Sequence, residues 1–579
     1  MDDPLPAAPP CGRGRHFRFE PRDLALLLML LLLSAGIRVW HIRHTEVTAR
    51  DGVGFIRYAW QLQHEPWTTV LRGNPHPPLY PLAILGVSIP LRQLVNDDAS
   101  RAMQLSAQVA SALAGVLLVI PMYYLGKELF NRSVGFWSAA IFQCLPASSR
   151  VLSDALAEGL WLLLAAFALL VALRAFRDRS VIGFAFCGAL SGLAYLARPE
   201  GLLLAAATGL VLFGVQLVPH WRRSWSSTIK CAAVLSLATL AIASPYALVI
   251  GHVTNKTTGI EILQTTSASA VSSQQVSCSL PPCGGGLGLG WGVTPNSYGA
   301  KAGGPLMRSV IGVFWFDAKK SAQWRRIIWS LKSLAGEIIK GCGYFAWLAV
   351  LIGLYWCRRP FSEEPGAWVI FALCALNTLV LWRVAYVAGY VAERHALPMV
   401  MCGLFWAVAA TFAIGSWLPA ALSRVHDWLR LQHISRPAQL LLALAQSAWL
   451  PVVLLLTQVG VALPRNLEPL HANRAGFHAA GLWLANHSEP HDVIVDPFAW
   501  VEYYAGHALQ EPRPQEAGAG VPRRQFVVLG GSGNEHARLP LMPTAESLAS
   551  RGTLVYRWPT ASTQRKAEEV LVYCVNPEQ

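Results

Sequence analysis

Long apolar runs separated by short polar connections dominate the chain from residue 24 to about residue 460. Most of these runs have the length at which an α-helix crosses a hydrocarbon core of about 30 Å. The pattern therefore predicts about eleven membrane-spanning helices. They cover residues 24–37, 103–125, 134–150, 155–173, 181–197, 200–218, 231–250, 341–357, 367–388, 396–416 and 438–460.

One apolar run does not fit a span. Residues 79–95 form a short run that follows His76-Pro77-Pro78 and is interrupted by Pro81 and Pro90. We expect a helix that lies in the outer interface of the membrane. A span at this position would invert the orientation of every later helix.

Basic residues mark one set of alternate connections. They cluster in residues 13–22, 127–132, 174–179, 222–230, 358–359 and 424–436, whereas the short connections on the other side carry only Arg150, Arg198 and Arg394. Because base-rich connections stay in the cytoplasm, this side is predicted to be inside. We expect a multi-pass protein of the plasma (inner) membrane whose first apolar run is an uncleaved helix and not a signal peptide.

Composition supports the membrane assignment. The chain is 54% hydrophobic and 14% charged, whereas about 25% is usual for a soluble domain. The net charge of +14 comes from the clusters that set topology, so it does not indicate nucleic-acid binding.

Three larger segments are predicted to face outward. They are the loops at residues 41–100 and 251–340 and the tail at residues 464–579. The tail is expected to be a small extracytoplasmic α/β domain. Residues 1–23 would be cytoplasmic, and residues 24–463 would form a transmembrane domain that includes the two loops. The expected strands of this tail are Val493–Val495, Gln525–Leu529, Thr553–Trp558 and Val570–Val575. Residues 530–533, Gly-Gly-Ser-Gly, favour a plain turn over a phosphate loop. Cys278 and Cys283 share the second outer loop, either as a local disulfide or as two free thiols.

Charged residues gather on the predicted outer face. Asp51 lies in the first outer loop, and Asp154 lies in the outer connection between the predicted spans 134–150 and 155–173. Arg198 and Glu200 lie in a later outer turn. Charges at membrane depth are costly, so they usually have a partner or a function. The alternative for any one of them is a headgroup anchor or a local salt bridge.

Several motifs on this face carry a family resemblance. They are Asp51 followed by Tyr58-Ala59, the stretch His76-Pro77-Pro78-Leu79-Tyr80-Pro81, and the segments at 149–154 (Ser-Arg-Val-Leu-Ser-Asp), 196–201 (Leu-Ala-Arg-Pro-Glu-Gly) and 393–398 (Glu-Arg-His-Ala-Leu-Pro). Together they resemble the motifs of GT-C superfamily glycosyltransferases, in particular the bacterial protein mannosyltransferase and aminoarabinose transferase branch. The resemblance covers residues 24 to about 416 and implies an all-α polytopic GT-C fold that precedes the α/β tail.

The resemblance also implies a reaction. Such enzymes move a sugar, a hexose or a pentose, from a polyprenyl-phosphate donor to an acceptor protein, lipid or glycan on the outer face, with inversion. Asp51 would be the catalytic base and Asp154 a second acid that positions the acceptor or a cation. The candidates for binding donor phosphate or substrate are Arg57, His76, Arg198, Glu200, Arg383, Arg394 and His395.

Two alternatives stay open at this point. Many family members have a second acid directly after the first-loop Asp, where this chain has Gly52, so a divalent cation is neither required nor excluded. A secondary transporter or a flippase for a lipid-linked substrate is the rival function, because transporters also place charges in membrane helices.

The topology leads to a direct prediction. Single cysteines placed in residues 126–133 and 421–437 should react with a membrane-impermeant maleimide only from the cytoplasmic side, and cysteines after residue 464 only from the outside. Labelling of the tail from the cytoplasmic side alone would contradict the arrangement.

Overall fold

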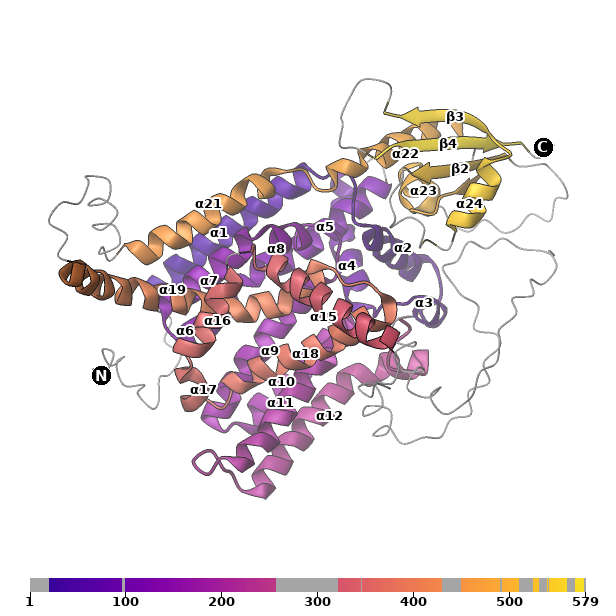
Figure 1. The fold of residues 1–579 in the computed structure, drawn as a ribbon. Helices are drawn as coiled ribbons and strands as arrows, with labels where there is room; N and C mark the ends of the chain where they lie inside the picture. Colours follow the sequence, from indigo (N-terminus) through magenta and orange to yellow (C-terminus); the bar gives the residue numbers. More distant parts are fainter. Residues whose placement is uncertain are drawn as a thin grey trace.

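A bundle of long helices carries a small sheet at one end (Figure 1). The structure is a computed structural model that describes residues 20–95, 99–256, 321–344, 346–429, 449–489, 492–509, 524–530, 539, 541–559 and 568–576. The sequence predictions for Cys278, Cys283 and the Gly-Ser-Gly turn fall outside these residues.

The helices before residue 256 are α1 (Pro21–Arg43), α2 (Arg50–His64), α3 (Trp67–Gly73), α4 (Leu79–Leu94), α5 (Ala99–Leu117), α6 (Val119–Leu129), α7 (Arg132–Cys144), α8 (Pro146–Val151), α9 (Glu158–Asp178), α10 (Val181–Ala197), η1 (Pro199–Gly201), α11 (Leu202–Gly214), η2 (Val215–Leu217) and α12 (Trp225–Ile250). Those after residue 320 are α15 (Ser321–Gly341), α16 (Ala346–Trp356), α17 (Arg359–Glu363), α18 (Ala367–Ala388), α19 (Glu393–Leu429), α21 (Leu450–Leu467), η4 (Ala472–Arg474), α22 (Ala475–His487), α23 (Trp500–Tyr504), η5 (His507–Leu509) and α24 (Met542–Ala549).

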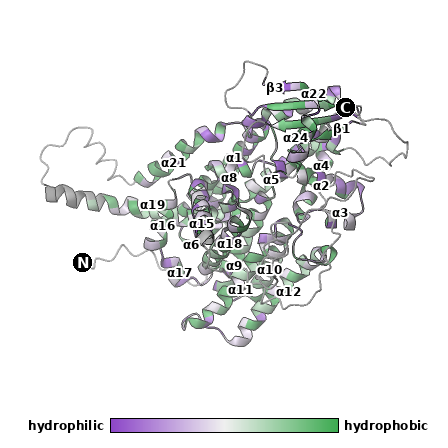
Figure 2. Ribbon diagram, turned by 45° about the vertical axis from the view of Figure 1, so that its right-hand side comes forward, coloured by the Kyte–Doolittle hydropathy of each residue, from purple (hydrophilic) through white to green (hydrophobic). Residues whose placement is uncertain are grey.

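Most of the predicted spans coincide with helices, while residues 438–448 of the last predicted span lie outside the described residues. Among the described residues, eight helices are long and apolar enough to cross a membrane, and a ninth is added if the bent pair α15 and α16 forms one span. The shorter apolar helix α10 falls on another predicted span. The bodies of these helices are predominantly apolar (Figure 2). The chain is therefore a mostly helical, multi-pass membrane protein. As predicted, α4 is a separate helix over the 79–95 run.

Three expected segments differ from the structure. The 134–150 run is not one helix, because Pro146 forces the preceding residue into an extended conformation, and α7 ends at Cys144. The outer loop expected to reach residue 340 instead becomes helical at Ser321. The 341–357 run bends away from α15 by 96°. Gly343 and Tyr344, both at positive φ, make this bend.

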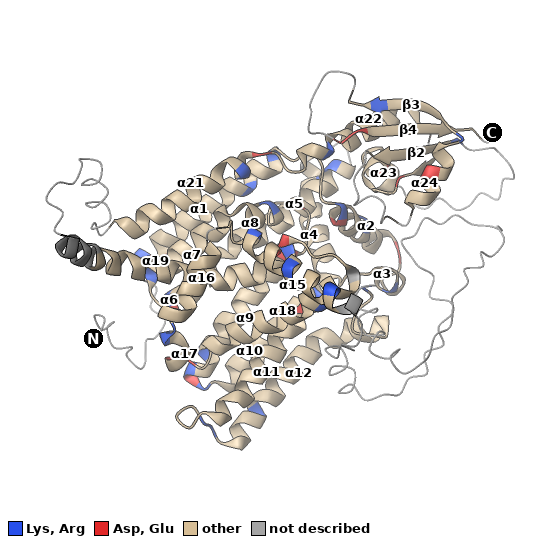
Figure 3. Ribbon diagram, viewed as in Figure 1, with Lys and Arg blue, Asp and Glu red and all other residues tan. Residues whose placement is uncertain are grey.

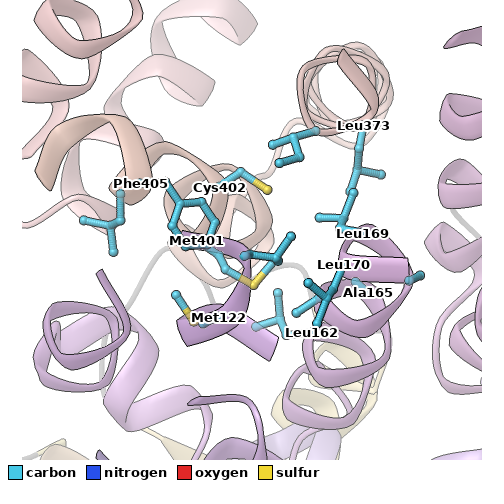
Figure 4. Packing of buried hydrophobic residues seen from close by; sticks show 14 of the residues in the cluster. Met122, Leu162, Ala165, Leu169, Leu170, Leu373, Met401, Cys402 and Phe405 are labelled. Atoms are coloured by element: carbon cyan, nitrogen blue, oxygen red, sulfur yellow. The ribbon is translucent and has the colours of Figure 1, made fainter. Parts of the chain in front are cut away.

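Large apolar side chains fill the centre of the bundle. Met122 of α6, Leu169 of α9 and Phe405 of α19 are fully or almost fully buried in one continuous cluster (Figure 4). Other helices approach closely through glycine. A Cβ added at Gly188 of α10 would lie 2.3 Å from the Leu235 carbonyl oxygen of α12. The small residue therefore sets the distance between these two helices.

The C-terminal domain contains the four predicted strands. Its mixed sheet has the order β1-β2-β4-β3, from β1 (Val493–Val495), β2 (Gln525–Gly530), β3 (Thr553–Trp558) and β4 (Val570–Val575). Strands β1 and β2 are parallel, and the other pairs are antiparallel. Phe477 and Trp500 of this domain share an apolar cluster with Val53 and Ile56 of α2. The domain thus packs on the first loop.

Charged residues concentrate at the two ends of the bundle (Figure 3). At the predicted inner end, Asp23 accepts hydrogen bonds from Lys127 and Arg132, both at 2.6–2.8 Å. A mostly apolar cavity of about 380 Å³ lies between α1, α6 and α9. Arg174, which is part of its lining, lies near this same end. Asp51 and the C-terminal domain lie at the opposite end. The side of the membrane that each end faces stays a prediction.

The glycine contacts predict opposite effects for one substitution at two sites. Gly188→Ala should destabilise the folded protein by about 1–3 kcal/mol, because its Cβ meets the α12 backbone. Gly209→Ala on α11 should be neutral or stabilising by up to about 1 kcal/mol, since nothing lies within 4 Å of its Cβ position. Thermal unfolding of the detergent-solubilised variants measures both, and equal shifts in Tm would contradict the packing.

Candidate active site

The ends of four segments bring charged side chains together beside the C-terminal domain. Asp51 lies in the first turn of α2, Glu158 begins α9, and Arg394 lies in the first turn of α19. Arg198 caps the C-terminal end of α10, and Glu200 follows it in η1. The acids at helix starts and the arginine at a helix end each complement the helix dipole.

These side chains form a chain of ion pairs. Arg394 Nη2 lies 2.6 Å from Asp51 Oδ2, and Arg394 Nε lies 3.8 Å from Glu158 Oε1. Arg198 Nη1 lies 2.5 Å from the same Glu158 oxygen. On its other side, Arg198 Nη2 lies 3.3 Å from Glu200 Oε1. Two arginines therefore alternate with three carboxylates.

The network runs from a buried centre to an accessible end. The Glu158 side chain is 5% exposed, Arg394 is 24% exposed, and Asp51 is 43% exposed. Arg394 holds the pKa of the Asp51 carboxyl well below its usual range. Asp51 is therefore an ionised, reachable carboxylate whose partner is anchored in the protein.

A lysine that the sequence analysis did not single out joins this network. Lys256 Nζ lies 3.6 Å from Glu200 Oε1 and is 31% exposed. The neighbouring Asn255 side chain donates to the Asn74 carbonyl of the first loop at 3.1 Å, which fixes this segment near Asp51. The available signal was a base just after the span 231–250, on the side where bases are rare.

The remaining candidates lie around the network at different places. His76 packs its ring on Phe55 at 4.6 Å between centroids. Burial, and then the positive charge of Lys256, lower the pKa of His76 to about 4, so it is neutral at neutral pH. His395 Nδ1 accepts from the Ala392 amide at 3.3 Å.

Two arginines have other neighbours. Arg57 pairs with Glu502 of the C-terminal domain at 2.5 Å. The Arg383 guanidinium lies over the Tyr386 ring, 5.4 Å from its centroid. The roles predicted for both stay predictions.

Asp154 belongs to a second cluster. Its side chain is 4% exposed, and Oδ2 lies 2.7 Å from Nε2 of His471, a residue of the C-terminal segment. Oδ1 accepts from the amides of Ala49 at 3.0 Å and Ala155 at 2.8 Å. Burial acts to raise the pKa of Asp154, but His471 and these amides outweigh it and lower the pKa.

Gly52 has a packing reason. A Cβ at this position would lie 2.8 Å from the Ala155 carbonyl oxygen and from Thr48 Oγ1. No second acid fits beside Asp51 while α2 packs this closely. Within the described part of the chain, no three His, Cys, Asp or Glu side chains form a group that could hold a metal ion.

Comparison with solved structures identifies the fold. ArnT from Cupriavidus metallidurans, solved with undecaprenyl phosphate, matches 95% of this chain and 97% of its own, with a TM-score of 0.50 and 14% identity. The chain has the GT-C fold. The dolichyl-phosphate-mannose-protein mannosyltransferase family matches residues 99–248, which lie within the bundle of this GT-C fold.

Two further structures are more distant. The apo oligosaccharyltransferase of Archaeoglobus fulgidus has a TM-score of 0.45 and 14% identity over 84% of this chain; the match spans 64% of that protein's length. The Saccharomyces cerevisiae protein O-mannosyltransferase Pmt1–Pmt2 complex, bound to its sugar donor, has a TM-score of 0.32 and 20% identity over 40% of this chain and 34% of its own. No curated protein sequence matches the chain significantly.

The Asp51–Arg394 pair predicts a pH-dependent stability difference. A carboxyl with a lowered folded-state pKa adds stability above its unfolded value, near pH 4, and loses it as pH falls further. The difference in Tm between wild type and Asp51→Asn should thus stay constant from pH 8 to 5 and shrink below about pH 4. Its size should be small, since Asp51 is 43% exposed. A difference already lost at pH 6 would show that Asp51 titrates near neutrality.

Proposed function

We propose that this protein is a membrane glycosyltransferase that moves a sugar from a polyprenyl-phosphate donor to an acceptor hydroxyl or amine. The observation that carries the proposal is the Asp51–Arg394–Glu158–Arg198 network, since it places an accessible carboxylate beside anchored cations. The GT-C fold and its similarity to an enzyme solved with undecaprenyl phosphate support the donor class. The acceptor is a protein, lipid or glycan, and the reaction face is extracytoplasmic.

Asp51 is the proposed base. The acceptor attacks C1 of the sugar, the C1–O bond to the donor phosphate breaks, and its electron pair stays on the phosphate oxygen. The acceptor proton passes to the Asp51 carboxylate, which is ionised and reachable. Attack from the face opposite the departing phosphate inverts the anomeric centre.

Cations beside Asp51 stabilise the leaving group. The donor is a phosphodiester, and the product polyprenyl phosphate is a monoester, so negative charge on the phosphate increases as the bond breaks. Arg394 and Lys256 are partly exposed, so they can contact the phosphate and stabilise its increasing negative charge. Arg198 is more buried, at 13% exposed, and orients Glu158 and Glu200 around them.

The Arg394 pair also gives the site an order of events. An aspartate whose pKa is held low is a weak base, because its proton affinity falls with its pKa. When a donor phosphate takes hydrogen bonds from Arg394, Asp51 loses part of that stabilisation and its pKa rises. Asp51 therefore becomes a better base once the donor is bound.

This scheme predicts that Asp51→Asn separates binding from turnover. Turnover should fall at least about a hundredfold, since a general base contributes about 10²–10⁴-fold. Affinity for polyprenyl phosphate should be unchanged or higher, because the carboxylate that competes for Arg394 is gone. By contrast, Arg394→Ala should lower the affinity for polyprenyl phosphate. Glu65→Gln, beyond the end of α2 in the same outer loop, is the matched control.

The measurements are initial rates with a lipid-phosphate sugar and equilibrium binding of polyprenyl phosphate, both in detergent. Near-normal turnover by well-folded Asp51→Asn protein would remove Asp51 from the mechanism. Unchanged affinity in Arg394→Ala would return Arg394 to a purely structural ion pair.

A further inference from the structure

The segment that leads into Asp51 is held by residues from far along the chain. Thr45 pairs with Leu470 in a parallel bridge: Glu46 N donates to the Leu470 carbonyl at 3.1 Å, and Leu470 N donates to the His44 carbonyl at 3.0 Å. The end of α1 and the segment after α21 therefore run side by side just before the candidate base.

Both backbone groups of Thr48 are bound by the C-terminal domain. Trp500 Nε1 donates to the Thr48 carbonyl at 2.9 Å. The Thr48 amide donates to the Tyr504 hydroxyl at 3.1 Å. Thr48 and the Trp500 indole are buried, so the Trp500 bond is shielded from water and stronger than a surface one. They fix the backbone three residues before Asp51.

Asp154 fixes the next residue. Its Oδ1 binds the amide of Ala49, which is the residue that precedes α2. Because an ionised carboxylate only accepts hydrogen bonds, the bond at its Oδ2 requires His471 Nε2 to carry the hydrogen. His471 therefore orients Asp154, Asp154 orients Ala49, and Asp51 follows two residues later.

The occupancy of Asp154 argues against a direct role in the reaction. Three protein donors bind Oδ1, namely the Ala49 and Ala155 amides and the Thr48 hydroxyl at 3.3 Å, and His471 binds Oδ2. With its side chain only 4% exposed, Asp154 has little capacity left for an acceptor or a cation.

We propose that the C-terminal segment completes the catalytic loop, and that His471 is a positioning residue that sets Asp51 through Asp154 and Ala49. The inference rests on the proposed function of Asp51. Displacement of a reacting group by about 1 Å can cost about a hundredfold in rate, so loss of the His471 hydrogen bond should lower kcat and leave donor binding intact.

The test compares three variants of the full-length protein in detergent. His471→Ala removes the donor, and kcat should fall about 10–100-fold with unchanged KM for the donor. His471→Gln places an amide N–H near the position of Nε2 and should recover most of kcat. Glu468→Gln is the matched control: it lies three residues earlier, is 64% exposed, and pairs only loosely with Arg150 at 3.5 Å.

A readout independent of activity accompanies the kinetics. Hydrogen exchange of peptides covering residues 48–56 should speed up in His471→Ala and return toward wild type in His471→Gln. The buried Asp154 oxygen loses its partner in His471→Ala, so any fall in Tm should also be recovered in His471→Gln. Trp500→Phe, which keeps a smaller aromatic side chain and loses the N–H bound to Thr48, should accelerate the same peptides. This second variant keeps the test decisive if His471→Ala does not fold.

The outcomes separate the two proposals. Absence of transfer by the wild-type protein overturns the proposed function, while faster exchange at 48–56 still supports the positioning contact. Transfer by the wild type with normal kcat and exchange in His471→Ala overturns the inference alone. A loss of kcat that tracks a fall in Tm and is not rescued by Gln also overturns it, because that pattern indicates a general structural role.

Discussion

The ion pair between Arg394 and Asp51 is the contact on which the geometry of this end of the bundle depends. It links the first turn of α19 to the first turn of α2, which are 343 residues apart in sequence. Through Glu158, the same arginine connects to Arg198 and hence to α9 and α10. These charges are tolerated close together because each has an opposite partner. An anionic substrate must therefore compete with carboxylates for these cations, which couples binding to the state of Asp51.

The elements were largely predictable from the sequence, and the contacts between them were predictable only in part. Apolar runs locate helices because length and composition decide that question, and short β-type runs between helical stretches located all four strands. The break at Pro146 is a local rule that could have been applied to the 134–150 run. Motif resemblance singled out Asp51, Arg198, Glu200 and Arg394, which the fold brings together. By contrast, His471, Trp500 and Tyr504 lie in a tail without a motif, and only the tertiary fold places them against Thr48 and Asp154.

The C-terminal domain therefore holds the first loop of the helix bundle in place. Its Trp500 and Tyr504 side chains bind the carbonyl and the amide of Thr48 in the first loop, and its apolar core is continuous with that of α2. Gly52 allows the start of α2 to pack against Ala155, because any side chain at position 52 would collide with Ala155. The loop that carries the proposed base is thus packed between a membrane helix end and a domain outside the helix bundle, which restricts its motion before any substrate binds.

The most direct test of the account is the fate of a lipid-phosphate sugar given to the purified protein in detergent, where no sealed compartment exists. A glycosyltransferase with Asp51 as its base should release polyprenyl phosphate and glycosylate the acceptor, and Asp51→Asn should slow both at least about a hundredfold. Movement of intact donor across sealed vesicles, with no release of polyprenyl phosphate in detergent, would contradict the account and indicate transport.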